Sequence, residues 1–190
     1  KIAIMQPTFL PWTGYVALAM CVDHFVFLDS VQFSRRSWQQ RNRVKNAGGE
    51  TMLTVPVVKG PRDQVISDVQ IKYDRTYPSK HLTTLIHAYS KADYFGEYSQ
   101  SFSDILNEND KNLSDLNIKI IEWLFKVLDI NTLTSRSSEL NVSGKRDELL
   151  VNICNELKAD HYVSPIGSSA YLDESPHFGE EGVNYSYINY

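Results

Sequence analysis

The sequence predicts an α/β fold built on a doubly wound, mostly parallel sheet of the Rossmann-like kind, with a helical insertion in the middle of the chain. The apolar run Ile2–Met5, a loop and a helical stretch follow one another within about twenty residues, which is the opening of a βαβ unit. The next strand, His24–Asp29, is apolar throughout its middle, as expected when both faces of a parallel strand are buried.

The first half of the chain is predicted to contain four strands and one helix. Pro7 and Pro11 interrupt regular structure after the first strand, and Gly14–Val22 is predicted to be a helix. The polar segment 30–49 ends in Asn-Ala-Gly-Gly, which is typical of a turn. Residues 51–58 are predicted to be the third strand, at an edge or with a bulge because of Pro56, and 69–71 to be a further short strand.

The second half is mostly helical at first and then alternates. Residues 77–128 show helical spacing of apolar residues, which predicts an inserted subdomain of helices within a single α/β domain, 1–190. The remaining predicted elements alternate between strand and helix: strand 132–135, helix 146–157, strand 161–164, a helix that begins at 171 and strand 183–188. This alternation favours parallel strands with helices on both faces of the sheet.

Composition limits the classes of function. The 190 residues carry a formal net charge of −4, so a nucleic-acid partner is not expected. No run of 18 apolar residues and no signal peptide is visible, so we expect no membrane association and a cytoplasmic protein. Cys21 and Cys154 are predicted to be buried free thiols, and the histidine spacing predicts no metal site. Composition does not indicate the oligomeric state.

The strongest signal for a ligand is a cluster of basic residues in the segment after the second strand. Five cations lie between residues 35 and 45, and no acidic residue occurs between Asp29 and Glu50. The arginine fork matches phosphate oxygens, and Trp38 could stack on a base or a sugar. We therefore predict nucleotide and phosphate binding by Arg36, Trp38, Arg41, Asn42 and Arg43. A solvated surface loop and a nucleic-acid patch are the alternatives.

Two helix starts are further candidates for phosphate binding. Gly14 and Tyr15 follow the proline-bounded loop, where a backbone N–H can approach an anion. Ser143, Lys145 and Arg146 precede the helix 146–157, with Ser143 as its predicted cap, and their positive charge opposes the helix dipole. In each case the alternative is a purely structural turn or cap.

The loops after the other strands supply candidate substrate-binding residues. Ligands of doubly wound sheets bind outside the carboxyl ends of the strands. Asp29 ends the second strand, and the alternative for it is a cap of the following turn. Ser164, Gly167 and Tyr171 follow a later strand, and Phe9 lies in the first loop. Packing of Phe9 into the core and a plain strand–helix turn at 164–169 are the alternatives.

The sequence resembles the WbqC-like protein family over nearly its whole length. The resemblance is carried by an N-terminal signature, by a central run and by several late motifs. These are 2–7, Phe9-Leu10-Pro11, Gly14-Tyr15, Asp23, Phe25-Val26, Asp29, Val31-Gln32, Trp38, 41–43, 53–57, 143–146, Tyr162-Val163-Ser164, Gly167, Tyr171-Leu172 and Phe178. Members of that family continue beyond the position of Tyr190.

The resemblance implies an enzyme of bacterial O-antigen, lipopolysaccharide or other surface-polysaccharide biosynthesis. Its expected activity is transfer of a glycyl or other acyl group to the amino group of a nucleotide-linked amino sugar. Gln6, Asp29 and Gln32 would orient or deprotonate the amine. The small-molecule substrate would be the nucleotide sugar, with ATP or an activated acyl or aminoacyl compound as donor and no firmly implied cofactor.

Two alternative functions remain open. The first is a non-catalytic protein that binds or assembles nucleotide sugars. The second is nucleotidylyl transfer, because the position of Gln6-Pro7 and Gly14-Tyr15 is analogous to that of the HIGH motif in the HUP and nucleotidylyl-transferase fold. The histidines of that motif are missing here, and similarity of fold alone is a weak basis for function.

Overall fold

The computed structural model describes residues 1–189, except the side chain of Tyr171. The chain forms two compact units. Unit 1 comprises residues 1–6, 11–30 and 125–190, and unit 2 comprises 7–10 and 31–124. The helical segment predicted as an insertion therefore lies in unit 2, together with the polar segment that precedes it.

Unit 1 contains a parallel sheet, which confirms the predicted α/β class. Within the described residues the sheet has the order β5-β2-β1-β6-β7, and every pairing is parallel. The strands are β1 (Ile2–Met5), β2 (His24–Phe27), β5 (Leu133–Arg136), β6 (His161–Pro165) and β7 (Asn184–Ile188). Counted along the chain this is the order 3-2-1-4-5 of Rossmann-like doubly wound sheets.

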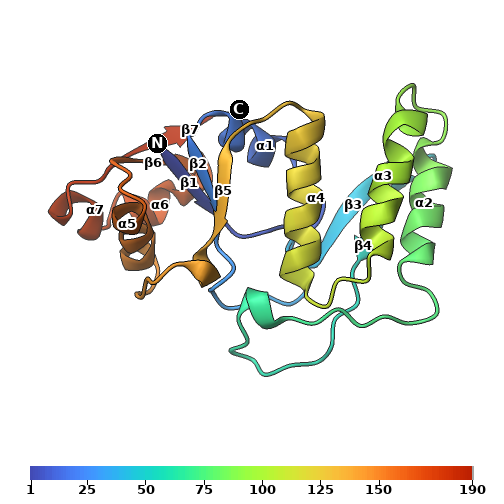
Figure 1. Ribbon diagram of the computed structural model, residues 1–190, viewed down its shortest axis with the longest axis horizontal. Helices are drawn as coiled ribbons and strands as arrows, with labels where there is room; N and C mark the ends of the chain where they lie inside the picture. The colour runs from blue at the N-terminus through green and yellow to red at the C-terminus, as the bar shows by residue number, and fades with distance from the viewer. Residues whose placement is uncertain (190) are drawn as a thin grey trace. The chain divides into compact units, whose positions relative to one another are not determined.

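The helices of unit 1 lie on both sides of this sheet. α1 (Thr13–Met20) and α5 (Asp147–Glu156) flank the strands from opposite sides in Figure 1. This placement follows from right-handed crossovers, because the chain moves outward from β1 in one direction and later in the other. The short helices α6 (Ser169–Leu172) and α7 (His177–Glu180) connect β6 to β7.

The core of unit 1 is formed by the strands and by the apolar face of α5. Ile2, Phe25 and Val26 are fully buried in the two central strands. The helical spacing of Leu149, Leu150 and Ile153 buries one side of α5, as the sequence predicts. The prediction for the cysteines is half right: Cys154 is buried, and burial raises the pKa of its thiol to about 12, but Cys21 is exposed at the end of α1.

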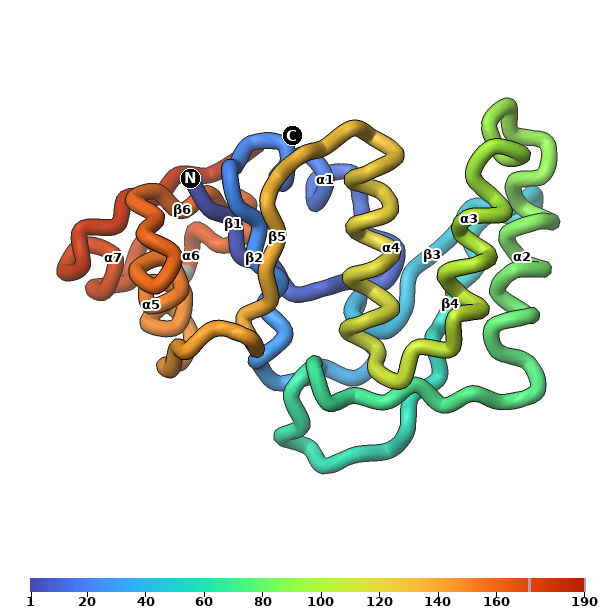
Figure 2. Tube along the Cα trace, in the orientation of Figure 1, coloured from blue at the N-terminus to red at the C-terminus, as the bar shows by residue number. Residues whose placement is uncertain are grey.

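Unit 2 combines an antiparallel hairpin with helices. β3 (Arg41–Asn46) pairs with β4 (Gly49–Thr54) through the predicted turn, in which the Asn46 side chain accepts the N–H of Gly48 at 2.8 Å. Figure 2 shows α2 (Ser79–Tyr89) and α3 (Phe95–Asn107) running side by side. α4 (Leu113–Val127) follows, and its last residues belong to unit 1.

The hairpin differs from the sequence prediction. Residues 41–46 lie in a segment predicted to be irregular, because β3 has a single buried apolar residue, Val44, and its alternation is hidden among polar side chains. The predicted third strand ends at Thr54 and pairs with β3 alone, outside the parallel sheet. The predicted strand 69–71 is reduced to isolated bridges, Val57 with Ile71 and Gln70 with Asn112.

The core of unit 2 encloses the second half of the proline-bounded loop. Phe9 is 1% exposed and packs in a cluster with Leu53, Ile66 and Leu116.

Among the described residues, no helix of either unit is long and apolar enough to cross a membrane.

Candidate functional site

The carboxyl edge of the parallel sheet in unit 1 is the first candidate site. The strand order reverses between β1 and β6, and the ladder between them is confined to Ile2 and Tyr162, whereas β6 and β7 share five register pairs. The carboxyl ends of β1 and β6 are therefore not paired with each other. At such a switch point a crevice forms, in which doubly wound proteins bind ligands.

Ser164, at the end of β6, is the most informative residue of this edge. Its side chain is completely buried, and its Oγ has no hydrogen-bond partner in the described structure. A buried hydroxyl without a partner costs about 1–3 kcal/mol. The unpartnered hydroxyl makes Ser164 a candidate contact for a polar ligand atom, once the residues that cover it move. Gly167 follows in the 3₁₀ turn 166–168, where a side chain would meet no other atom.

Gln6, Gly14 and Tyr15 lie at the same edge. Gln6 directly follows β1 and is exposed, while Gly14 and Tyr15 are buried in the first turn of α1. The Tyr15 hydroxyl donates to the Gln6 carbonyl oxygen at 3.3 Å, and burial raises the pKa of Tyr15 well above its usual value. Tyr15 thus holds the backbone of Gln6 and remains a neutral donor.

Asp29 acts as a clamp between two strand ends. It is fully buried. Its Oδ1 accepts the Ser137 hydroxyl at 3.2 Å and the Ser138 N–H at 2.9 Å, and its Oδ2 accepts the Ser138 hydroxyl at 2.9 Å. The Ser137 Oγ in turn accepts the N–H groups of Asp29 and Ser30. Both carboxylate oxygens are therefore engaged within the protein.

The two serines were not among the residues predicted for the site. Ser137 and Ser138 follow β5 directly in the 3₁₀ turn 137–139. The available signal was a pair of hydroxyl residues immediately after a predicted strand. Because the carboxyl ends of parallel strands share one edge of the sheet, this pair falls opposite Asp29 at the end of β2.

The residues at the start of α5 form hydrogen bonds mainly with other groups of the protein. The first helical turn carries Asp147 and Glu148, and the Glu148 carboxylate accepts the Lys145 N–H at 3.2 Å. Arg146, not Ser143, precedes the helix, and no side chain caps it. The Ser143 carbonyl accepts the Asn152 side chain at 2.8 Å. The side chains of Lys145 and Arg146 are exposed.

The arginines predicted to bind phosphate lie on unit 2. Arg41, Arg43 and Lys45 alternate with Asn42 and Val44 along β3, so the cations share one face of the hairpin. Arg43 is exposed, lies 5.8 Å from the ring centroid of Trp38 and pairs with Glu50 at 3.0 Å. The other face is structural.

Asn42 and Phe9 serve that structural face. The Asn42 side chain donates to the carbonyl oxygens of Phe9 and Leu10, at 3.2 and 2.6 Å. The Phe9 N–H donates to the Trp38 carbonyl oxygen at 2.9 Å. Phe9 itself is a core residue, as the alternative to substrate binding proposed. Trp38 keeps half of its side chain exposed.

Gln32 and Arg36 occupy the turn before the hairpin. The Gln32 side-chain amide donates to the Arg62 carbonyl oxygen at 2.7 Å. Arg36 is exposed, has a positive φ of 59° and donates its N–H to the Gln40 side chain at 3.2 Å. The side chain of Tyr171, predicted to bind substrate, lies outside the described residues. The predicted residues therefore divide between the two units, and each unit brings its own group together.

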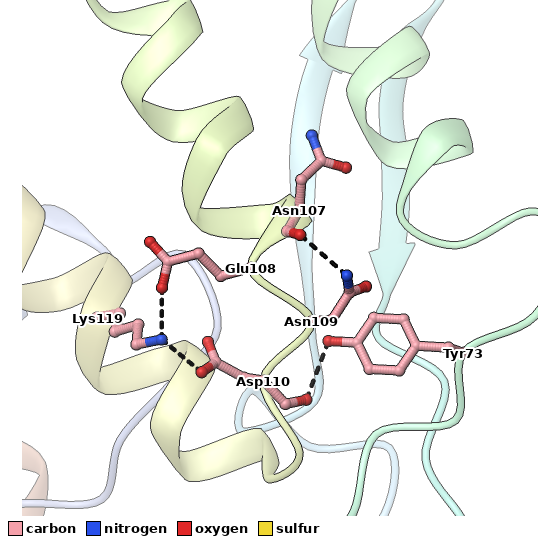
Figure 3. Close-up of polar contacts among 6 residues, drawn as sticks. All are labelled: Tyr73, Asn107, Glu108, Asn109, Asp110 and Lys119. Carbon is pink, nitrogen blue, oxygen red and sulfur yellow. Dashed lines mark hydrogen bonds and ion pairs between the residues drawn. The ribbon is translucent and has the colours of Figure 1, made fainter.

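A further polar cluster in unit 2 contains a lysine that is paired with two carboxylates. Lys119 lies between Glu108 and Asp110, at 2.6 and 2.5 Å, and the Tyr73 hydroxyl donates to the Asp110 carbonyl oxygen at 3.0 Å (Figure 3). Partial burial lowers the pKa of Lys119, but the hydrogen bonds and charges of the two carboxylates outweigh this effect and raise it. This lysine is committed to the turn between α3 and α4.

Fold and site together define a Rossmann-like α/β protein with a candidate ligand site at the carboxyl edge of its sheet, where the strand order reverses between β1 and β6. The family comparison is more specific. Residues 6–190 match the model of the WbqC-like protein family, and the chain belongs to that family. It is 34% identical to the uncharacterized protein Rv1507c of Mycobacterium tuberculosis (strain ATCC 25618 / H37Rv), over all of this chain and 82% of that protein. No solved structure matches the chain.

Proposed function

We propose that this protein is a transferase that adds a glycyl or other acyl group to the amino group of a nucleotide-linked amino sugar in surface-polysaccharide biosynthesis. The observation that carries the proposal is the carboxyl edge at the β1–β6 switch point, with the buried, unpartnered hydroxyl of Ser164. The membership of the chain in the WbqC-like family supports the same conclusion.

The proposed reaction is an acyl transfer without a covalent enzyme intermediate. The neutral amine of the sugar attacks the carbonyl carbon of an activated donor, such as an acyl phosphate or an adenylate made from ATP. The C–N bond forms, the C–O bond to the leaving phosphate breaks, and the proton of the amine passes to the released phosphate group or to solvent water. Holding both reactants in line would supply much of the rate enhancement.

The polar groups of the edge have separate roles in this proposal. Gln6 would orient the amine, as the sequence predicts, and the Ser164 hydroxyl would bind a sugar hydroxyl. Asp29 would shape the edge through Ser137 and Ser138, because its oxygens are already hydrogen-bonded. The proposed setting is the cytoplasm, where nucleotide sugars are available.

The test is an incubation with isotope-labelled glycine, ATP and a panel of nucleotide-linked amino sugars, followed by mass spectrometry of the sugar fraction. We expect label in an amide of the sugar. Ser164→Ala should lower the yield at least tenfold, whereas Ser90→Ala, an exposed serine on unit 2, should leave it unchanged. If no labelled product forms with glycine or with any activated acyl donor, the transferase proposal is wrong.

One observation favours a second candidate, a non-catalytic nucleotide-sugar-binding protein. The best-placed carboxylate of the carboxyl edge, Asp29, is buried and fully engaged, so it is not free to accept a proton from an amine. Tight binding of a nucleotide sugar without turnover of any donor would support this candidate.

A further inference from the structure

A depression on unit 2 collects positive charge outside the predicted arginine cluster. Its volume is about 520 Å³, and it lies between the segment that precedes the hairpin and the turn after β4. The lining residues are Gln32, Phe33, Ser34, Arg35, Lys59, Gly60, Pro61 and Arg62. We call this site the basic depression. Cavities that hold small molecules generally measure about 300–1,000 Å³.

The charged residues that line the basic depression are all positive. Three of its lining residues are cations, Arg35, Lys59 and Arg62, and none is acidic. No carboxylate forms an ion pair with any of the three among residues 1–189. Lys119 and Arg43, by contrast, are paired with carboxylates. In a protein of net charge −4, an uncompensated group of this kind indicates an anionic ligand.

Backbone pairing gives the depression a defined shape. The Phe33 N–H donates to the Gln64 carbonyl oxygen at 2.8 Å, and the Ile66 N–H donates to the Val31 carbonyl oxygen at 2.9 Å. These bonds hold the two walls against each other. Phe33 is buried beneath them.

Hydrogen bonds also place the cations. The Arg35 Nη2 donates to the Gly60 carbonyl oxygen at 2.8 Å, which leaves most of its five N–H donors available. The Gln32 amide donates to the Arg62 carbonyl oxygen at 2.7 Å and so ties the turn 59–62 to the opposite wall. An arginine held in this way loses little further entropy when it binds an anion.

We propose that the basic depression binds the diphosphate of a small-molecule ligand, with Arg35 as a forked donor and Lys59 and Arg62 as additional positive charges. Two or three cations match the charge of a diphosphate, and the guanidinium geometry matches its oxygens. The inference rests on the proposed function for its natural ligand, a nucleotide sugar or a nucleoside triphosphate, and assigns their common group to residues other than Arg36, Arg41 and Arg43.

The experiment measures affinity for inorganic pyrophosphate by isothermal titration calorimetry at fixed ionic strength. Arg35→Ala and Arg62→Ala should each weaken binding by about tenfold to a hundredfold, the loss expected for one charge-assisted hydrogen bond. Arg35→Lys should give an intermediate loss, because it keeps the charge and removes the fork. Arg75→Ala is the matched control, since Arg75 is exposed on unit 2 and lies outside the depression.

Several results would overturn the inference. Equal weakening by Arg75→Ala and Arg35→Ala would show non-specific attraction, and no measurable pyrophosphate binding would exclude the site. Tighter binding of a single-stranded oligonucleotide than of a nucleoside diphosphate would exclude a small-molecule ligand. Because the substituted side chains are exposed, unchanged melting temperatures would show that the variants fold.

The same variants separate this inference from the proposed function. Pyrophosphate binding that depends on Arg35, without acyl transfer, would support the basic depression as a diphosphate site and contradict the transferase proposal. If Arg35→Ala carries out acyl transfer with an unchanged KM for both the nucleotide sugar and ATP, the diphosphate site in the basic depression is contradicted and the transferase proposal is supported. Titrations with a nucleoside diphosphate and a nucleoside triphosphate then identify which of the two ligands it binds.

Discussion

The carboxyl edge of unit 1 and the basic depression of unit 2 are polar sites built in opposite ways. At the edge, Asp29 and Ser137 are buried and satisfied by each other, and Ser164 is buried with a free hydroxyl. In the depression, Arg35, Lys59 and Arg62 are exposed, and none of them forms an ion pair with a carboxylate among residues 1–189. The comparison shows that the buried polar groups around Asp29 maintain structure, whereas the exposed cations of the basic depression form no ion pair in the described structure.

The largest effect should come from the buried clamp. Asp29→Ala removes three hydrogen bonds and leaves the Ser138 N–H and the hydroxyls of both serines without their acceptor. We expect the free energy of unfolding of unit 1 to fall by about 2–4 kcal/mol, measured by urea denaturation. Asp160→Ala, which removes an exposed carboxylate of the same unit, should change it by less than about 0.5 kcal/mol. Similar losses in both variants would contradict the clamp.

Two buried serines of the edge provide a matched pair. Ser137→Ala should lower the free energy of unfolding by about 1–3 kcal/mol, because it removes a hydroxyl that donates to Asp29 Oδ1 and accepts the N–H groups of Asp29 and Ser30. Of these two N–H groups, that of Asp29 keeps the Phe27 carbonyl oxygen as an acceptor at 3.0 Å. Ser164→Ala removes a hydroxyl that has no partner and should leave stability unchanged or slightly higher. Urea denaturation of both variants measures the difference. A loss of stability in Ser164→Ala as large as that in Ser137→Ala would show that Ser164 is structural.

The stability of unit 2 should respond to pH through a buried histidine in its interior. His81 is 7% exposed and packs against Tyr77 and Phe9, and neither ring nitrogen forms a hydrogen bond of standard geometry. Burial lowers the pKa of His81, and the Thr54 backbone only partly opposes this shift. Above about pH 6.5 both the folded and the unfolded states are neutral at this residue. Below that pH the unfolded chain takes up the proton first, so the protein loses stability.

The measurement is urea denaturation between pH 7.5 and pH 5. The slope due to His81 should reach at most about 1.4 kcal/mol per pH unit, and His81→Phe should remove it. His87→Phe, on the exposed side of the same helix, should keep it. Equal slopes in the wild type and His81→Phe would refute the prediction.

The smallest effect should come from the hairpin arginine. Arg43 forms an exposed ion pair with Glu50, so Arg43→Ala should cost no more than about 1 kcal/mol of stability. We expect its pyrophosphate affinity to stay within about threefold of the wild type, since the pairing carboxylate already neutralises this side chain. If Arg43→Ala weakens pyrophosphate binding more than Arg35→Ala does, the phosphate site lies on the hairpin, as the sequence predicted.

The parallel sheet could be predicted because its evidence is local. The apolar run of β2 and the proline-bounded loop after β1 need no distant partner to be recognised. The hairpin strand β3 was missed because its pattern of one buried apolar residue among polar ones becomes a strand only when β4 pairs with it. The turn between the two strands was predicted correctly because Asn and Gly carry that signal themselves.

The candidate sites show the same division. The sequence alone determined the α/β class, the position of Gln6, Asp29 and Ser164 at strand ends, and the concentration of positive charge after the second strand. It did not determine which hydroxyls meet Asp29, which cations meet Arg35, or which arginines are neutralised by a carboxylate. Secondary structure follows from neighbouring residues, whereas these contacts join residues up to 109 positions apart and exist only once the sheet and the loops are folded.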